Sequence, residues 1–262
     1  MGRSAGNTRE PPAPSQSVAE QPADVSQRAG ERDPFLLVLL PIACVLLFVA
    51  LALGLVAFAT ASERATAIDW EQERAAFVRD LDTAIYDTPS RDEKTKALEA
   101  LDARAAALEK LYPKRAEPLV LHAWALRAQG DISGGTMAGF SLGRQAVEKL
   151  EAAIERDPGV YGAATYASLG ALYADVDVPA VSGMFRKRAR LYLEKALVLD
   201  PRGAPQNLSF GWLSLKEKDH AAALRFATAA REAPARPGRE KADADMRERA
   251  LALIAAVNEQ VR

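Results

Sequence analysis

The sequence has few of the residues that most catalytic and metal sites require. It contains one cysteine and two histidines in 262 residues, which excludes an intrachain disulfide and a cysteine-rich metal site. No group of histidines, cysteines and carboxylates has metal-ligand spacing. A Gly-x-Ser-x-Gly element is missing, and Gly134-Gly135 lacks the strand and the lysine of a phosphate loop. We therefore predict that the protein is not an enzyme and that it holds neither metal nor cofactor.

Net charge and aromatic content are also low. The net charge is −1, so no strong positive field favours nucleic acid as a partner. Aromatic residues make up 6% of the chain and alanine is abundant, a composition that favours helices over sheet. His122 occupies an inward helix position where leucine is usual, so we predict a core or groove histidine rather than a ligand. The composition thus predicts an all-α protein.

One long hydrophobic run lies near the N-terminus. Residues 35–61 are 27 residues without a charged side chain, and about 20 are enough for a helix to cross a bilayer. Residues 1–34, rich in Pro, Ser and Gln, are predicted to be a disordered tail because they cannot bury enough apolar surface. A cleaved signal peptide would have a shorter core, and a lipoprotein site at Cys44 would place Pro41 where leucine is preferred. We predict one uncleaved transmembrane helix.

The positive charges beside this span do not decide its orientation. Arg28 and Arg32 precede it, and Arg64, Arg74 and Arg79 follow it. A short tail, one span and a large domain are commonly arranged with the tail inside. We therefore expect a single-pass protein of the bacterial inner membrane, with the helical domain in the periplasm.

The rest of the chain repeats one series of small and large residues. The series is Ala146-x3-Leu150-x2-Ala153-x4-Pro158, then Ala189-x3-Leu193-x2-Ala196-x4-Pro201, then Ala222-x3-Phe226-x2-Ala229-x4-Pro234, and Tyr166-x2-Leu169-Gly170-x2-Tyr173 precedes the middle copy. Small residues let two antiparallel helices approach, large ones fill the space between them, and proline ends the second helix. This is the tetratricopeptide pattern, so we predict a solenoid of helical hairpins. An irregular alanine-rich bundle is the alternative.

The periodicity divides the remainder of the chain into three parts. Residues 62–116 are predicted to form a helical hairpin that is a degenerate first repeat, with Ser90 and Glu93 placed to cap its second helix. Residues 117–240 are predicted to form three repeats. Residues 241–262 have apolar residues at helical spacing, and we predict a capping helix that covers the last repeat.

The spacing of the prolines departs from the standard repeat of 34 residues. Pro113 to Pro158 is 45 residues, Pro158 to Pro201 is 43, and Pro201 to Pro234 is 33. The series within each second helix is constant, so the surplus lies between the two helices of a repeat. We therefore predict two long loops inside the first two of these repeats, at 130–146 and at 173–189.

These two predicted loops are the best candidates for function, because insertions on this edge of a solenoid often build a binding face. Their apolar residues would be costly to leave in water, so they either pack on each other or cover a pocket. The basic residues that follow the second loop are either solvated, with Arg190 pairing with Glu194, or meet an acidic ligand, a lipid headgroup or a partner. The candidate binding residues are Gly134, Gly135, Met137, Phe140, Tyr166, Tyr173, Met184, Phe185, Arg186 and Arg188.

Residues 117–257 resemble the T component of TRAP-type transporters and its tetratricopeptide relatives. The resemblance rests on Ser133-Gly134-Gly135, the segments 166–173 and 192–201, and Arg236-Pro237-Gly238-Arg239, in this order. It implies helical repeats around a hydrophobic cavity and a periplasmic solute-binding protein as partner. Members that resemble this chain are often lipoproteins, whereas a membrane span is predicted here.

Two functions follow from these expectations, and they differ in what lines the binding site. A transport-associated protein would hold a small apolar or amphipathic ligand in a closed pocket made by Met137, Phe140, Met184 and Phe185. A scaffold for membrane-complex assembly would instead dock helices or peptides of a protein partner in an open groove lined by polar and charged side chains. Both functions are non-catalytic.

Overall fold

A computed structural model of the chain describes residues 68–176 and 182–261. Within these ranges every regular element is a helix, which confirms the all-α prediction. The predicted tail at 1–34 and the predicted span at 35–61 lie outside the described residues. None of the helices in the described ranges is both long and apolar enough to cross a membrane.

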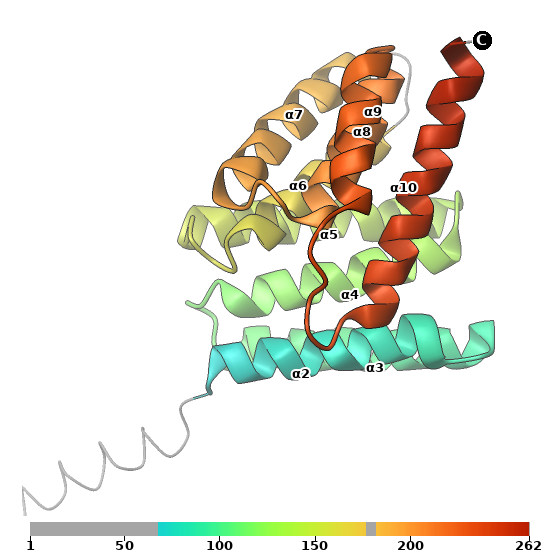
Figure 1. Cartoon of the computed structure of the whole chain (residues 1–262). Coiled ribbons are helices and arrows are strands. Elements are labelled where there is room, and N and C mark those ends of the chain that lie inside the picture. The colour runs from blue at the N-terminus through green and yellow to red at the C-terminus, as the bar shows by residue number, and fades with distance from the viewer. Residues whose placement is uncertain (1–67, 177–181, 262) are drawn as a thin grey trace, which may run out of the picture. The chain divides into compact units, whose positions relative to one another are not determined.

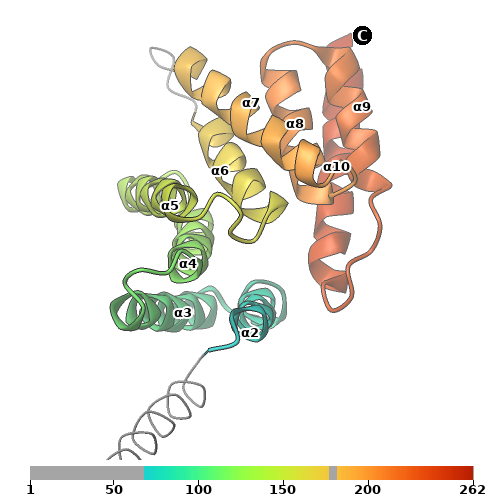
Figure 2. The ribbon, with the colours of Figure 1, turned by 90° about the vertical axis from the view of Figure 1, so that its left-hand side faces the viewer.

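The helices pack mainly on their neighbours in the chain. In chain order they are α2 (Trp70–Asp82), the π-helical turn η1 (Thr83–Asp87), α3 (Arg91–Leu111), α4 (Glu117–Ser133), α5 (Met137–Arg156), α6 (Ala163–Asp175), α7 (Ser182–Leu199), α8 (Ala204–Lys216), α9 (His220–Arg231) and α10 (Glu240–Val261). α6 and α7 cross the direction of α3, α4 and α5 (Figures 1 and 2). The most extensive packing joins α4 to α5, α6 to α7 and α8 to α9. The segment predicted as a first hairpin holds α2, η1 and α3.

Short polar side chains start several of these helices. The Ser90 hydroxyl accepts a hydrogen bond from the Glu93 backbone N–H at 3.2 Å, which confirms the N-cap predicted for α3. The Thr136 hydroxyl does the same for the Gly139 N–H at 3.1 Å and begins α5. The side chain of Asp219 caps α9. These caps fix where each helix starts and therefore which of its faces meets the core.

The core follows the order of the hairpins, because the first helix of each hairpin is buried on two sides. On α4, Leu121 and Ala125 pack with α2 and α3, whereas Ala123 and Leu126 pack with α5 and α6. Each hairpin thus contacts mainly its neighbours in the chain.

The first two copies of the predicted series are fully buried. Ala146, Leu150 and Ala153 on α5 and Ala189, Leu193 and Ala196 on α7 all have 0% exposure. The packing of α6 against α7 also depends on Gly170, because a Cβ at that position would lie 2.7 Å from Leu193 Cγ. The series therefore marks the contact between the two helices of each pair, as its small–large–small order predicts.

The third copy of the series, on α9, was predicted one residue too early in the sequence. The buried residues of α9 are Ala223, Ala227 and Ala230, not Ala222, Phe226 and Ala229. Phe226 is half-buried and packs its ring against Phe210, with 4.5 Å between ring centroids. The correct series has the same spacing but carries alanine where the other two carry leucine. The space that this alanine leaves is filled from another helix, as described below.

The two predicted long loops are mostly helix. α4 continues through Gly130 to Ser133 and α5 begins at Met137, so the loop predicted at 130–146 is a turn of three residues. Helical hydrogen bonding continues through the extra residues. The chain packs closely at Gly139, where a Cβ would lie 2.4 Å from the Gly134 carbonyl oxygen, so only glycine fits there. Of the loop predicted at 173–189, residues 173–175 belong to α6 and residues 182–189 to α7, and residues 177–181 lie outside the described ranges.

α10 begins beside the first hairpin and packs along α8 and α9 (Figure 1). Its Leu253 is fully buried, and a Cβ at Gly211 on α8 would lie 2.8 Å from Leu253 Cδ2. Leu253 therefore occupies, next to Gly211, the place that Leu193 takes next to Gly170. The helix predicted to cap the last repeat is part of the core of that repeat.

Candidate binding surfaces

Three of the predicted apolar site residues are exposed at the ends of hairpins. Met137 and Phe140, in the first turn of α5, are 83% and 64% exposed, and Met184 in the first turn of α7 is 53% exposed. Gly134 and Gly135 form the exposed turn before α5, where Gly134 adopts a positive φ of 64°. These side chains meet solvent and do not enclose a pocket within the described part of the chain.

The remaining predicted aromatic residues meet in a row of four rings between α6 and α7. Phe185 stacks on Tyr173 with 5.9 Å between centroids, Tyr173 on Tyr192 with 5.9 Å, and Tyr192 on Tyr166 with 6.4 Å. Tyr166 and Tyr173 are only 6% and 3% exposed. The structure thus brings Tyr166, Tyr173 and Phe185 together, but two of them are packed in the core and unavailable for direct contact with a ligand. The sequence did not identify Tyr192 as a candidate, because Tyr166 and Tyr173 belong to the repeat pattern and Tyr192 does not.

Charged groups complete the polar contacts of this aromatic row. The Tyr173 hydroxyl donates to Glu151 Oε1 at 2.5 Å and accepts from Arg188 Nη1 at 2.9 Å. Burial first, and then the Glu151 carboxylate, raise the pKa of Tyr173 to about 12, while Arg188 opposes the shift. The phenol is therefore neutral at physiological pH and acts as a fixed donor between α5 and α7.

The predicted basic cluster has specific partners. Arg186 Nη2 donates to the Ser182 hydroxyl at 3.1 Å, and Arg188, half exposed, lies 5.5 Å above the Tyr173 ring. Arg190 does not pair with Glu194 as predicted. It forms an ion pair with Glu217 of α8 and lies 5.1 Å from the Phe210 ring centroid. Arg188 is therefore the member of this cluster that combines a fixed position with an exposed guanidinium.

His122 is the centre of a polar network that joins α3, α4 and α5. Its Nδ1 lies 2.6 Å from Glu109 Oε1 and its Nε2 lies 2.7 Å from Asp102 Oδ1. Lys149 Nζ lies 2.5 Å from Glu109 Oε2. Asp102 Oδ1 is buried and makes no hydrogen bond, although it lies close to the imidazole. The prediction of a groove histidine missed these partners, which lie on other helices.

Glu109 is the acid that this network holds in its charged form. Burial alone would raise the pKa of Glu109, but hydrogen bonds from His122 and Lys149 outweigh burial and lower it. Such a chain of charges has the parts of an acid–base site, yet the described residues contain no group of three His, Cys, Asp or Glu side chains that could hold a metal ion. We interpret the network as a polar contact between hairpins.

Charged residues also line the side of α4 that faces α6. Arg127 Nη2 donates to Asp175 Oδ2 of α6 at 2.9 Å, and its Nε lies 3.7 Å from Asp131 Oδ2. Desolvation is the largest cause of the raised pKa of Asp131, and Arg127 opposes it. The surface that α4 and α6 share here is therefore polar and charged.

Aromatic residues near the middle of α4 join this helix to the connection between α5 and α6. Trp124 stacks on Tyr161 with 5.8 Å between centroids and donates its indole N–H to the Ser168 hydroxyl of α6 at 3.0 Å. Arg74 of α2 lies 5.0 Å from the Tyr161 ring centroid. Tyr161 has a positive φ of 49°, which is unusual for a residue other than glycine. This strained residue fixes the connection between α5 and α6 against α2 and α4.

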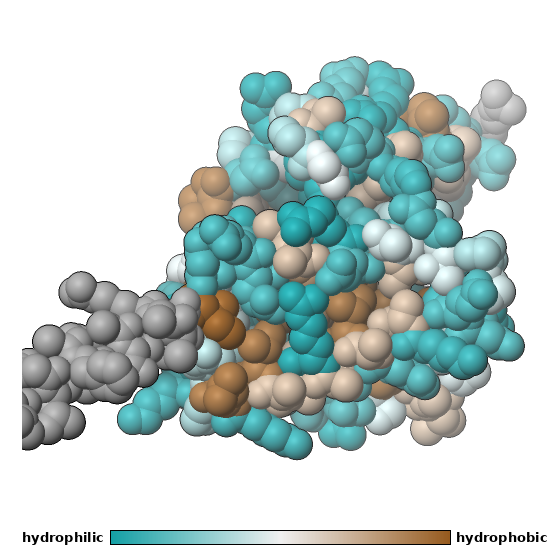
Figure 3. All heavy atoms as spheres, turned by 90° about the horizontal axis from the view of Figure 1, so that it is seen from below, coloured by the Kyte–Doolittle hydropathy of each residue, from teal (hydrophilic) through white to brown (hydrophobic). Residues whose placement is uncertain are grey.

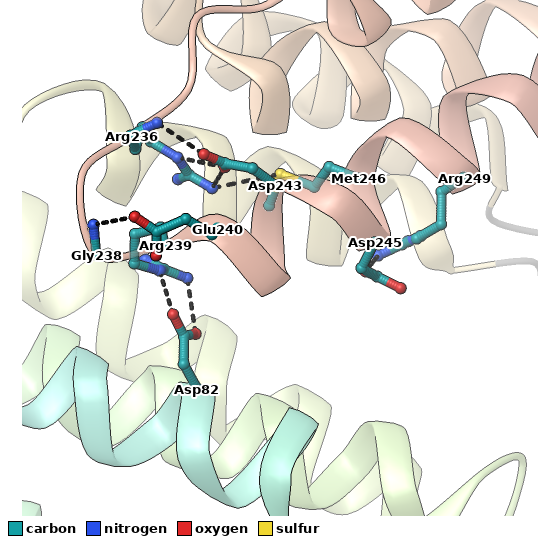
Figure 4. Close-up of polar contacts among 9 residues, drawn as sticks. All are labelled: Asp82, Arg236, Gly238, Arg239, Glu240, Asp243, Asp245, Met246 and Arg249. Carbon is teal, nitrogen blue, oxygen red and sulfur yellow. Dashed lines mark hydrogen bonds and ion pairs between the residues drawn. The ribbon is translucent and has the colours of Figure 1, made fainter.

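The Arg-Pro-Gly-Arg segment binds α10 to the first hairpin (Figure 4). Arg236 contacts the buried carboxylate of Asp243 through its backbone N–H at 2.7 Å and its Nε at 2.8 Å. Arg239 Nη2 donates to Asp82 Oδ1 of α2 at 3.0 Å. Its Nε lies 2.5 Å from Asp82 Oδ2 but makes no hydrogen bond of its own. Lys241 forms a second ion pair, with Asp87 of η1.

A further apolar band lies on the first hairpin. Seen from the side of α2 and α3, apolar side chains form a band between hydrophilic ones (Figure 3). Ala100, Ala103 and Ala107 of α3 are exposed, and Leu111 is 68% exposed. A depression along α2 is lined by residues 68–79 alone, so a ligand there would touch only this helix and the residues just before it. Neither feature has the converging polar groups of a small-molecule site.

Comparison of the sequence with models of protein families gives no match, and comparison with curated proteins gives none either. The resemblance to the T component of TRAP-type transporters therefore remains an expectation from the residues that carry it.

Proposed function

We propose that the protein is a non-catalytic helical-repeat scaffold that is held at a membrane by its predicted span and binds a protein partner. The observation that supports this best is the exposure of Met137 and Phe140. They lie three residues apart on one face of α5, in a turn that Thr136 caps. Fully burying such a side chain contributes about 1.5–3 kcal/mol, so a fixed pair of exposed apolar residues favours contact with another protein surface.

The transport-associated alternative, implied by the resemblance, requires an enclosed cavity under these residues. Three of the four side chains that would line it are more than half exposed. The surface around Arg127 and Asp131 is charged rather than apolar. Both observations favour recognition of a protein over storage of a small apolar ligand, although a periplasmic solute-binding protein would itself be a suitable protein partner.

Photo-cross-linking in cells tests this proposal. A photoreactive amino acid in place of Phe140 in the full-length chain should give a discrete protein adduct on irradiation. The matched control is the same residue in place of Ala252, which is also exposed but lies on α10. Native mass spectrometry of the purified chain accompanies the experiment. No adduct from position 140, together with a stoichiometric small molecule on the purified chain, would overturn the proposal in favour of the transport-associated function.

A further inference from the structure

The outward face of α7 carries a straight row of exposed apolar residues. Met184, Leu191 and Val198 are 53%, 50% and 83% exposed. They are seven residues apart, almost two helical turns, so they lie on one line along the helix. Leu199, beside the end of the row, is 56% exposed. The row covers 14 residues of helix, or about 21 Å at 1.5 Å per residue.

No described helix covers this row. α7 packs on α6 and α8, and it does so through Ala189, Leu193 and Ala196, which are completely buried. Leu191 and Leu193 are two residues apart, so they point to nearly opposite sides of the helix. The apolar row therefore faces away from the solenoid.

Two basic residues lie beside the apolar row. Arg188 and Lys195 each follow an apolar residue of the row by four positions and are exposed, and residues four apart are neighbours on a helix. Arg188 lies 5.5 Å above the Tyr173 ring, and Lys195 lies 5.5 Å above the Tyr166 ring. The buried aromatic row thus holds both cations in place while their charges stay exposed.

We propose that the face formed by Met184, Leu191 and Val198 with Arg188 and Lys195 docks an acidic amphipathic helix of a protein partner. Apolar residues at a seven-residue spacing fit between the side-chain ridges of a second helix. The basic flank selects a partner helix with Asp or Glu beside its apolar positions. The row is one residue wide and 21 Å long, dimensions that fit a helix of about four turns better than a flat lipid surface.

This inference rests on the proposed scaffold function but concerns a different surface from the end of α5. Glu194 is the exposed acidic residue on this face of α7. It lies three residues from Leu191 and one from Lys195, so a basic residue on the partner helix would fix the direction in which that helix runs.

Binding of two synthetic helical peptides to the full-length chain in detergent tests the charge preference. One peptide has leucine at heptad spacing with glutamate flanks, and the other has lysine flanks. Fluorescence anisotropy should show at least tenfold tighter binding of the acidic peptide. The variant Lys195→Glu should reduce this preference. Equal affinity for both peptides, or a preference that the variant leaves unchanged, would overturn the proposal.

Matched leucine variants test the apolar row. Leu191→Asp should weaken binding of the acidic peptide at least tenfold. Leu224→Asp, at a leucine of α9 that is 40% exposed, should leave it unchanged. Both substitutions are at exposed positions, and circular dichroism melts check that the fold is retained. Equal effects of the two variants, or binding to anionic vesicles through Lys195 without any binding of the acidic peptide, would contradict the assignment.

A photoreactive residue at Val198 in cells separates this inference from the proposed function. A protein adduct at position 198 whose cross-linked peptide is acidic supports the docking surface. An adduct at position 140 with none at position 198 leaves the scaffold function standing and overturns the α7 surface. No adduct at either position overturns both.

Discussion

The α6/α7 and α8/α9 hairpins share the spacing of their buried residues but fill the space beside their central glycine differently. Leu193 of α7 lies against Gly170 of its own hairpin, whereas Leu253 of α10 lies against Gly211. The equivalent of Leu193 in α9 is Ala227, which is too small to fill that space. A middle hairpin therefore contains its own core residue. The last hairpin is complete only when α10 is packed on it.

The strongest test of this difference exchanges the residue sizes between α9 and α10. Leu253→Ala should lower the free energy of unfolding by about 2–5 kcal/mol, because it leaves a cavity. Ala227→Leu alone should lower it by about 1–3 kcal/mol through overpacking. The double variant should be more stable than the sum predicts, since the new leucine occupies the vacated space. Urea denaturation of the four proteins gives the coupling energy, and strictly additive effects would show that the two positions do not share one space.

The same comparison explains which parts of the fold were predictable. The series on α5 and α7 and the Ser90 cap were correct because periodicity and capping act within one helix. The register of α9 was predicted wrongly, because Ala221, Ala222 and Ala223 allow two registers. Only Leu253, far along the chain, selects one of them. The predicted loops were wrong for a related reason: Gly139, Ser141 and Gly143 favour turns locally, but they remain helical in α5 once Thr136 caps it.

The candidate site residues show the same difference between what is local in the sequence and what depends on distant helices. The sequence identified Met137, Phe140 and Met184 as apolar residues between helices, and they are exposed. It did not identify the partners of His122, which come from two other helices, or the ion pair between Asp82 and Arg239, which are 157 residues apart. Contacts between distant segments leave no spacing in a single sequence. Their residue types gave no signal beyond ordinary charged helix surfaces.

The second test concerns the polar attachment of α10. Arg239→Met should lower the free energy of unfolding by about 1–3 kcal/mol, because it leaves the Asp82 carboxylate desolvated without a partner. Asp82→Asn should cost less. Desolvation already outweighs the attraction of Arg239 and raises the pKa of Asp82 above its usual value of 3.8. Hydrogen exchange of the α10 amides measures both effects, and a larger loss in Asp82→Asn would contradict this account.

The pH dependence of these variants has a definite sign. Because the pKa of Asp82 is raised in the folded state, the Asp82 carboxyl stabilises the folded protein fully below pH 3.8. This stabilisation is lost as pH rises through the raised pKa. Removing Arg239 takes away a charge that lowers this pKa, so the loss with rising pH should be larger in Arg239→Met than in the unmodified protein. Asp82→Asn should remove this component of the profile.

The smallest expected effect comes from alanine at the two glycines. A Cβ at Gly170 would approach Leu193 Cγ at 2.7 Å and the Leu193 backbone nitrogen at 3.1 Å, so the two helices must separate. A Cβ at Gly211 would meet mainly the movable end of Leu253. Alanine gains about 1 kcal/mol of helix propensity at both positions. Gly170→Ala should therefore be net destabilising and Gly211→Ala close to neutral in thermal melts, and the reverse order would refute the different packing of the two hairpins.

The contact between Arg239 and Asp82 also sets the number of hairpins in the domain. Repeat arrays commonly grow and shrink by duplication or loss of a unit, which leaves their two ends unaffected. Here one more hairpin between α3 and α10 would add at least one helix spacing of about 8–10 Å between the ends, and the guanidinium could no longer reach the carboxylate. Duplication of a hairpin would thus break the contact between Arg239 and Asp82.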